Sequence, residues 1–224
     1  MQHLISRKKG NYPISDHLRS YLTRYGRIWS ESIRYRDLSR FTNAIPVYDE
    51  KGKDTLWSTV LYSENDRKEI HEQLLTAYAI LKADGDTSIA KYLYIDRVDQ
   101  CIHGNTLPFR IRVVNRINDN FDYFYVKKID ANRIYGLEME HILSPNRINY
   151  FIHAQTIVEE HIIGIPADAF LREEIPVTDF DQVRLAKEFV KFNERCFISL
   201  LGDMHSGNFV IELTRDFEKW HFRM

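Results

Sequence analysis

Residues 200–211 read LLGDMHSGNFVI, and they carry the spacing on which the assignment of the fold depends. Asp203 lies five residues before Asn208, and an apolar run that predicts a strand follows directly. A phosphoryl-transfer site needs a carboxylate near the acceptor hydroxyl and a neutral oxygen ligand for a metal ion, and one short loop can hold both. An ordinary polar turn is the alternative, because Gly, Asp, Ser and Asn are frequent in turns.

Composition indicates a folded protein with no strong electrostatic preference. The 224 residues are 44% hydrophobic and 13% aromatic, which is enough for a substantial core in one or two domains. The net charge of −1 gives no clear signal for nucleic acid or for an anionic membrane. Residues 1–42 hold nine Lys or Arg against three acids, which favours a solvated helix face over an arm that docks on an acidic partner or nucleic acid.

Cysteine use and hydropathy predict the compartment. Cys101 and Cys196 are far apart and have no companion at metal-ligand spacing, which favours a reduced, cytoplasmic protein over a disulfide framework. No apolar run approaches the roughly 18 residues of a membrane span, and the start MQHLISRKKG lacks the apolar stretch of a signal peptide. We therefore expect a cytoplasmic protein with no membrane partner.

The first 90 residues predict mostly helix. One helix begins at Ser15 or Asp16 and is interrupted near Gly26, and a second is capped at Ser63 and ends near Gly85. Between them, the cluster DEKGKD predicts an exposed turn between two short strands.

Residues 91–130 predict an antiparallel meander. Strand-like runs cover residues 92–98, 108–115 and 122–129, and the Asn-Asp-Asn turn near residue 118 joins the last two. A helix over residues 132–143, stopped by Pro145, and strands over 148–155 and 157–163 follow. A final helix is expected from Thr178 onward, and the sharpest boundary lies at residues 164–174. The fold class predicted is α+β.

This order of elements, with the motif at its end, resembles the protein-kinase-like fold, in particular the branch that contains aminoglycoside phosphotransferases and choline kinases. The resemblance implies a kinase-like small lobe and hinge at residues 91–166, built from an antiparallel sheet and one helix. It also implies a partial helical large lobe with the catalytic loop at residues 167–224. Residues 1–90 would be an N-terminal helical extension.

The resemblance implies roles for a lysine and a glutamate of the small lobe. The run FYVKKID at residues 124–130 resembles the third small-lobe strand, so Lys127 would contact the nucleotide phosphates, while Lys128 would point to the opposite face. Helical periodicity puts Glu138 at the edge of the apolar side and Glu140 towards solvent. Glu138 is therefore the expected partner of Lys127, and a surface helix former is the alternative.

The hinge and the catalytic loop complete the implied site. Residues 157–166 resemble the hinge, whose backbone holds adenine, so Glu160 and His161 are expected beside the nucleotide. Asp203 would accept or orient the acceptor proton, and Asn208 would bind a metal ion on the phosphates. His205 matches a histidine common in that branch. The alternative, that His205 is a zinc ligand, is disfavoured because no second ligand lies at a suitable spacing.

Three departures separate this chain from the family pattern. Leu201 stands where the pattern has a histidine, and the loop at residues 99–106 contains only Gly104 where several glycines usually approach phosphate. A hairpin at residues 209–224, with its turn at 214–219, ends where an Asp-Phe-Gly-type metal aspartate is expected, and Asp216 is only a superficial match. The chain is thus expected to be a truncated piece or a divergent member.

The leading hypothesis is an ATP-dependent phosphotransferase that uses ATP and Mg²⁺ to transfer the γ-phosphate to an unidentified hydroxyl-bearing acceptor. The alternatives are a non-catalytic nucleotide-binding or interaction module, that is a pseudokinase, and an unrelated α+β binding protein. Apolar surface left by an incomplete lobe could promote self-association.

Overall fold

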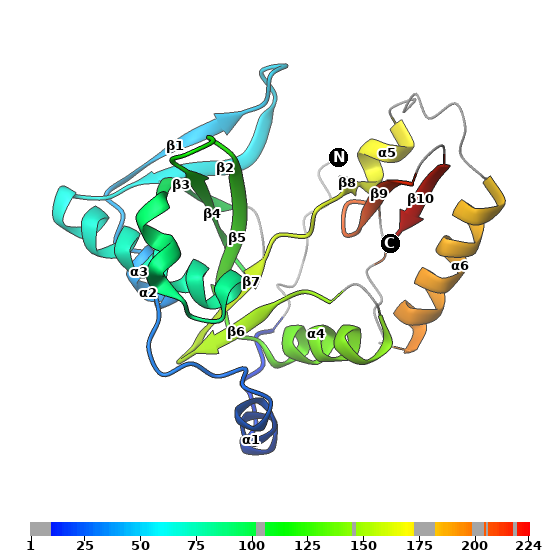
Figure 1. Cartoon of the computed structure of the whole chain (residues 1–224), viewed down its shortest axis with the longest axis horizontal. Helices are drawn as coiled ribbons and strands as arrows, with labels where there is room; N and C mark the ends of the chain where they lie inside the picture. The colour runs from blue at the N-terminus through cyan, green and yellow to red at the C-terminus, as the bar shows by residue number, and fades with distance from the viewer. Residues whose placement is uncertain are drawn as a thin grey trace. The chain divides into compact units, whose positions relative to one another are not determined.

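The computed structural model describes residues 10–101, 106–144, 147–172, 182–198, 204, 206–216 and 219–224. They form an α+β protein in which most of the strands belong to one antiparallel sheet (Figure 1). In chain order the elements are α1 (Asp16–Arg24), α2 (Tyr35–Leu38), β1 (Asn43–Tyr48), β2 (Asp54–Leu61), α3 (Glu64–Ala83), η1 (Thr87–Tyr92), β3 (Leu93–Cys101), β4 (Phe109–Asn115), β5 (Phe121–Lys128), α4 (Ala131–Leu143), β6 (Tyr150–His153), β7 (Thr156–Glu160), β8 (Ile165–Pro166), α5 (Ala167–Arg172), α6 (Gln182–Ile198), β9 (Val210–Asp216) and β10 (Lys219–Arg223).

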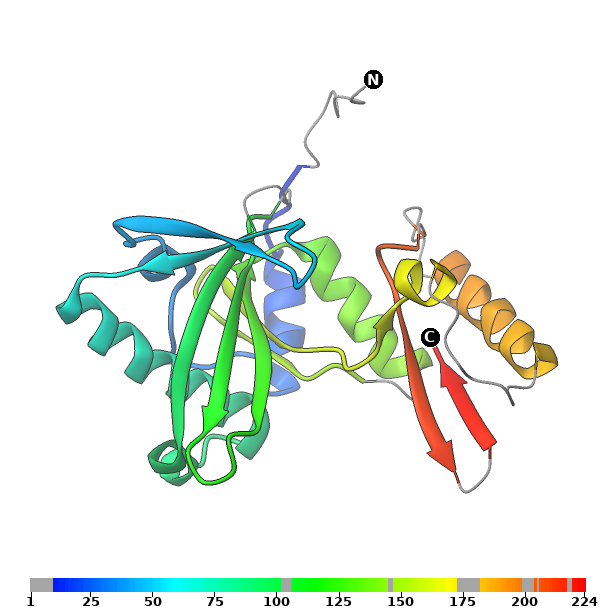
Figure 2. The same ribbon diagram turned by 90° about the horizontal axis from the view of Figure 1, so that it is seen from above.

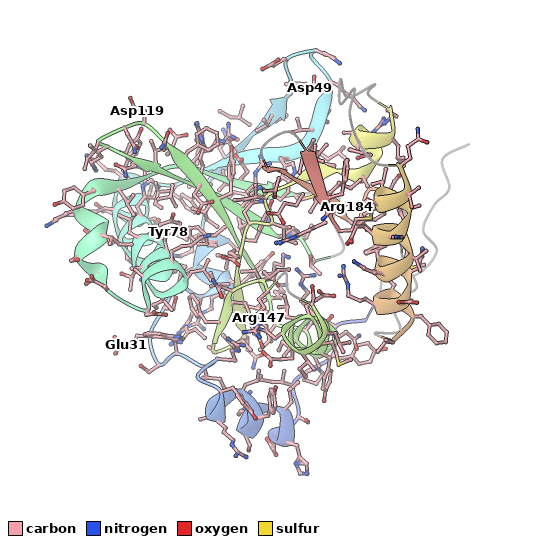
Figure 3. All side chains as sticks on the ribbon, turned by 45° about the vertical axis from the view of Figure 1, so that its right-hand side comes forward. Glu31, Asp49, Tyr78, Asp119, Arg147 and Arg184 are labelled. Carbon is pink, nitrogen blue, oxygen red and sulfur yellow. The ribbon has the colours of Figure 1, made fainter. Side chains whose placement is uncertain are left out.

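The large sheet has the strand order β1-β2-β3-β4-β5-β7-β6. Hairpins join β1 to β2, β3 to β4 and β4 to β5, whereas α3 and η1 lie between β2 and β3 in the chain. Every neighbouring pair of strands is antiparallel. Asp119, which is labelled in Figure 3, lies at the β4–β5 turn. Its φ is 56°. In the chain, α4 lies between β5 and β6. The last two strands join the edge of the sheet in reversed order, so that β7 pairs with β5 and β6 lies outside β7.

One face of the sheet is covered by α2 and α3. Ser63 begins α3, because its hydroxyl accepts the backbone N–H of Asp66, and Asp84 ends it in the left-handed conformation. Ile70 and Leu74 from this helix are fully buried and pack in one cluster with Ile111 and Phe124 of the sheet. Burying an aliphatic side chain of this size stabilises the fold by about 1.5–3 kcal/mol.

A second hydrophobic cluster joins α1 and α4 to β6 and β7. Leu18 and Leu22 of α1 pack with Ile134 of α4 and with Ile152 and Ile157 of the strands. The chain leaves α1 at Gly26, whose φ is +66°, and then forms a parallel bridge between Ile28 and Ile152. The predicted interruption near Gly26 is confirmed.

The chain divides into two compact units, Met1–Glu138 with Asn146–His161, and Met139–Pro145 with Ile162–Met224. The predicted boundary at residue 90 falls inside the first unit, because β1 and β2 extend the same sheet and α3 fills its core. β1, β2 and α3 therefore belong to the same unit as the rest of the large sheet. The second boundary, at His161, lies close to the one predicted at residue 166.

The second unit contains the three-stranded sheet β10-β9-β8 with α5 and α6. Ala167, Ile211 and Phe222 form its small buried cluster. Figure 2 shows the predicted hairpin as β9 and β10, in red, together with α6. Strand β9 is longer than predicted, because Asp216 still pairs with Lys219 as the last residue of β9.

Candidate functional site

Two cations converge on one buried carboxylate on the face of the sheet opposite α3. Glu159 lies on β7 and is 1% exposed. Lys127 Nζ donates to its Oε2 at 2.8 Å, and Arg133 of α4 donates from Nε and Nη2 to its two oxygens at 3.0 and 2.7 Å. We call Lys127, Arg133 and Glu159 the Glu159 cluster, and its formal charge with both cations protonated is +1.

Burial and charge act in opposite directions on the groups of the Glu159 cluster. Burial alone would raise the pKa of Glu159, but the charges and hydrogen bonds of Arg133 and Lys127 lower it to about 2. Burial lowers the pKa of Lys127, and the carboxylate only partly offsets this effect. Arg133 keeps its proton, since Glu159 raises its pKa against the effect of burial. The buried carboxylate is therefore ionised at neutral pH.

The exposed edge of the Glu159 cluster is cationic. The side chains of Lys127 and Arg133 are 20% and 43% exposed, whereas that of Glu159 is 2% exposed. Part of each cationic side chain therefore reaches solvent, whereas the Glu159 side chain does not. An anion that approaches this face meets ammonium and guanidinium donors, which form strong charge-assisted hydrogen bonds with phosphate or carboxylate oxygens.

Polar residues continue the cluster across the sheet in one row. Thr59, Asp99, Arg110, Tyr125 and Glu159 are successive partners on β2, β3, β4, β5 and β7. Asp99 is fully buried and accepts from Thr59 Oγ1 and from Arg110 Nη2, each at 2.8 Å. Arg110 shares this carboxylate with Arg97, whose Nε lies 3.1 Å from Asp99 Oδ2.

Aromatic rings interleave with these charges. The Arg110 guanidinium lies 4.4 Å from the ring centroid of Trp57 and 5.2 Å from that of Tyr123, and Lys127 lies 5.4 Å from that of Tyr125. Cation–π contacts of this kind hold the cations flat against the sheet. The face therefore combines planar apolar surfaces with positive charge.

Glu138 does not pair with Lys127, so that expectation is wrong. It is 8% exposed and accepts hydrogen bonds from Tyr21 Oη, Arg27 Nε and Tyr150 Oη at 2.8, 3.0 and 2.5 Å. Burial would raise the pKa of Glu138, but the tyrosine hydroxyls and Arg27 lower it. These residues, which we call the Glu138 cluster, join α4 to α1 and β6.

Helix geometry explains why α4 offers an arginine to the lysine strand. Arg133 and Glu138 are five residues apart, which turns them about 140° from one another around the helix axis. When Arg133 contacts Glu159, Glu138 must face elsewhere, and it faces α1. In place of the expected pair of Lys127 with a helix glutamate, the structure has a lysine, a helix arginine and a strand glutamate.

Glu160 and His161, the expected hinge residues, lie at the end of β7. Glu160 accepts from the Asn149 backbone N–H at 2.6 Å and from Lys82 Nζ at 3.2 Å. The His161 ring contacts Tyr123 and Tyr125, with Nδ1 3.2 Å from the Tyr125 hydroxyl, and burial lowers its pKa. His161 therefore lies on the same face of the sheet as Tyr125 and Lys127. Glu160 links the end of β7 to Asn149 and to Lys82 of α3.

The predicted catalytic loop is described only in part. Asp203, His205 and Gly104 lie outside the described residues. Asn208 is exposed and precedes β9, in a segment anchored by backbone hydrogen bonds of 3.0 Å from Ala167 to Phe209 and from Asp168 to Ser206. Among the residues that the structure describes, no three His, Cys, Asp or Glu side chains are grouped so as to hold a metal ion.

Sequence reasoning missed Glu159 and Arg133. A signal existed, because a glutamate inside the apolar run of residues 157–163 can be buried only with a cationic partner. Lys127, on the neighbouring strand β5, has the complementary charge.

In the described ranges, no helix is long and apolar enough to cross a membrane. No family model, curated protein or solved structure matches the chain.

Proposed function

We propose that the chain is a nucleotide-binding protein of kinase-like type, in which the Glu159 cluster contacts the phosphates of ATP. The observation that carries this proposal is a buried carboxylate paired with two cationic side chains that are each partly exposed, which gives the cluster an excess of one positive charge. Arriving phosphate oxygens would favour the charged form of Lys127, whose pKa burial has lowered.

The arrangement of strands supports the same proposal. The lysine lies on the third strand of a meander, α4 follows it, and the next two strands pair in the order β7-β6 beside β5. This is the order expected for a kinase-like small lobe. The aromatic rings of Tyr123, Tyr125 and Trp57 offer apolar surface on the same face, which suits a nucleobase.

Phosphoryl transfer to a hydroxyl acceptor is the activity that the loop at residues 200–211 would add. Asp203 would accept or orient the acceptor proton, and Asn208 would supply an oxygen ligand to Mg²⁺, which in such sites neutralises charge on the phosphates. The free thiols of Cys101 and Cys196 suit a reducing cytoplasm, where ATP is abundant.

A non-catalytic nucleotide-binding module is the second candidate, and a specific observation favours it. The helix presents Arg133 rather than a glutamate to the lysine strand, and Glu138 belongs to the Glu138 cluster. Lys127 is then oriented by a strand carboxylate, a geometry that suits phosphate binding without requiring transfer.

A thermal-shift titration with ATP and Mg²⁺ tests the nucleotide site, because a ligand that binds only the folded state raises the melting temperature of the protein. We expect a saturable rise in the wild type and none in Lys127→Met. Lys128→Met is the matched control, since the neighbouring lysine lies on the opposite face of β5, and it should respond as the wild type does.

An unshifted wild type, or a loss of response in Lys128→Met with retention in Lys127→Met, would refute this site. Asp203→Asn separates the two candidates. If the wild type consumes ATP with a hydroxyl acceptor and Asp203→Asn does not, while both bind ATP, the chain is a phosphotransferase. Binding without turnover in either protein identifies the non-catalytic module.

A further inference from the structure

A second cationic site lies at the end of β5, on the face that Lys128 presents. A cavity of about 380 Å³ is bordered there by the start of α2, the end of β5 and the β6–β7 turn. The polar and aromatic side chains that line it include Asn11, Arg34, Tyr35, Arg36, Lys128 and Gln155. Lys128 follows Lys127 in the strand, so its side chain points to the opposite face from the Glu159 cluster.

The charge of this lining is one-sided. Arg34, Arg36 and Lys128 contribute three positive charges, and among the residues that the structure describes no Asp or Glu lines the cavity. By contrast, a cavity of about 450 Å³ beside α3 sets Glu64 and Glu72 against its cations, and a smaller one that shares Arg34 contains Glu31 and Asp37. An excess of three cations is unusual in a chain whose net charge is −1.

The three cations are weakly neutralised. Arg36 Nε lies 3.9 Å from Asp37 Oδ1, and its side chain is 74% exposed. Within the described part of the chain, no ion pair is formed by Arg34 or Lys128. Their donors remain available for an anion, and a guanidinium can bind two phosphate oxygens at once.

The floor of the cavity is held firmly. Tyr35 is 7% exposed, its backbone N–H donates to Thr156 Oγ1 at 2.8 Å, and its hydroxyl donates to the Leu107 carbonyl at 2.8 Å. Lys128 Nζ lies 5.1 Å from the centroid of the Tyr35 ring. The lysine is therefore positioned over a fixed aromatic surface at the wall of the cavity.

We propose that this cavity binds the phosphate group of a small phosphate monoester, with Arg34, Arg36 and Lys128 around the phosphate. Asn11 and Gln155 supply amide groups for hydroxyls of the organic part, and Tyr35 supplies an apolar surface against it. The volume is at the lower end of the roughly 300–1,000 Å³ typical of small-molecule sites, which suits a molecule of sugar phosphate size.

Calorimetric titration of the full chain with ribose 5-phosphate, inorganic phosphate and unphosphorylated ribose tests the proposal at constant ionic strength. We expect saturable binding of ribose 5-phosphate, at least as tight as that of inorganic phosphate, and no binding of ribose. Arg34→Gln/Lys128→Gln should weaken it about tenfold or more, since each removes charged hydrogen bonds.

Two controls keep this site distinct from the nucleotide site and from general charge effects. Lys51→Gln/Lys53→Gln removes the same charge from the exposed β1–β2 turn and should bind as the wild type does. Lys127→Met should also bind normally. Absence of binding in the wild type, equal weakening in both double variants, or loss in Lys127→Met would overturn the proposal. Tighter binding of inorganic phosphate than of ribose 5-phosphate would overturn the proposal that the ligand is a phosphate monoester.

Discussion

The Glu138 and Glu159 clusters differ in how a buried carboxylate is neutralised. Glu138 accepts from two tyrosine hydroxyls and one arginine, so its cluster contains one positive and one negative charge. Glu159 accepts from a lysine and an arginine, so its cluster has a cation in excess. The first arrangement balances its charges and links α4 to α1 and β6. The second has an excess positive charge that can attract an anionic ligand. A buried acid leaves positive charge for a ligand only when its cationic partners outnumber it.

Removing the charge of Glu159 should have the largest effect of the changes considered. Glu159→Gln leaves Lys127 and Arg133 without a counter-charge, and loss of one partner from a buried pair typically costs about 3–5 kcal/mol. Glu138→Gln should cost about 1–2 kcal/mol, because tyrosine hydroxyls can still donate to the amide oxygen. Urea unfolding at pH 7 measures both free energies. Equal losses would remove the distinction between the clusters.

Lowering the pH should remove much of the stabilisation that ionised Glu159 provides. Its folded-state pKa of about 2 lies below its ordinary value of 4.5, so the stabilisation is fully present above pH 4.5 and is lost as pH falls towards 2. The shift corresponds to about 3 kcal/mol. The difference in unfolding free energy between wild type and Glu159→Gln should therefore shrink over this interval. A difference that stays constant from pH 6 to pH 2 would contradict the assigned pKa.

A smaller effect is expected in the Glu138 cluster on removal of one hydroxyl. Tyr150→Phe deletes a 2.5 Å hydrogen bond to Glu138 and should destabilise the fold by about 1–2 kcal/mol. Tyr25→Phe, at a tyrosine that is 55% exposed, is the matched control and should be nearly neutral. Urea unfolding compares the two variants. The response of Tyr150→Phe to ATP should equal that of the wild type, and a lost response would mean that the Glu138 cluster takes part in binding.

Local signals predicted most of the elements. The Ser63 cap, the break at Gly26 and the turn near residue 118 are decided by hydrogen bonds and backbone preferences within a few residues, and each is confirmed. The alternation of β5 also separated Lys127 from Lys128 correctly, because successive strand residues face opposite sides.

Strand neighbours and helix rotation could not be predicted in the same way. The pairing of β2 with β3, which joins residues before and after position 90 in one sheet, depends on which edges meet in space. The partner of Lys127 depends on the rotation of α4 about its axis, which the packing of Leu137 and Ile134 in the second cluster sets.

The sequence alone determined the α+β class, the order of the longer strands and helices and the position of a lysine in the third strand of the meander, whereas the short elements α2, η1, β8 and α5 were not predicted. Only the tertiary structure decided that this lysine shares Glu159 with Arg133, that Glu138 joins α1 to α4, and that Lys128 lies beside Arg34 and Arg36. Periodicity and capping act over a few residues, so a sequence displays them directly. Ion pairs link residues that are distant along the chain, and they are selected by burial and geometry when the elements pack together.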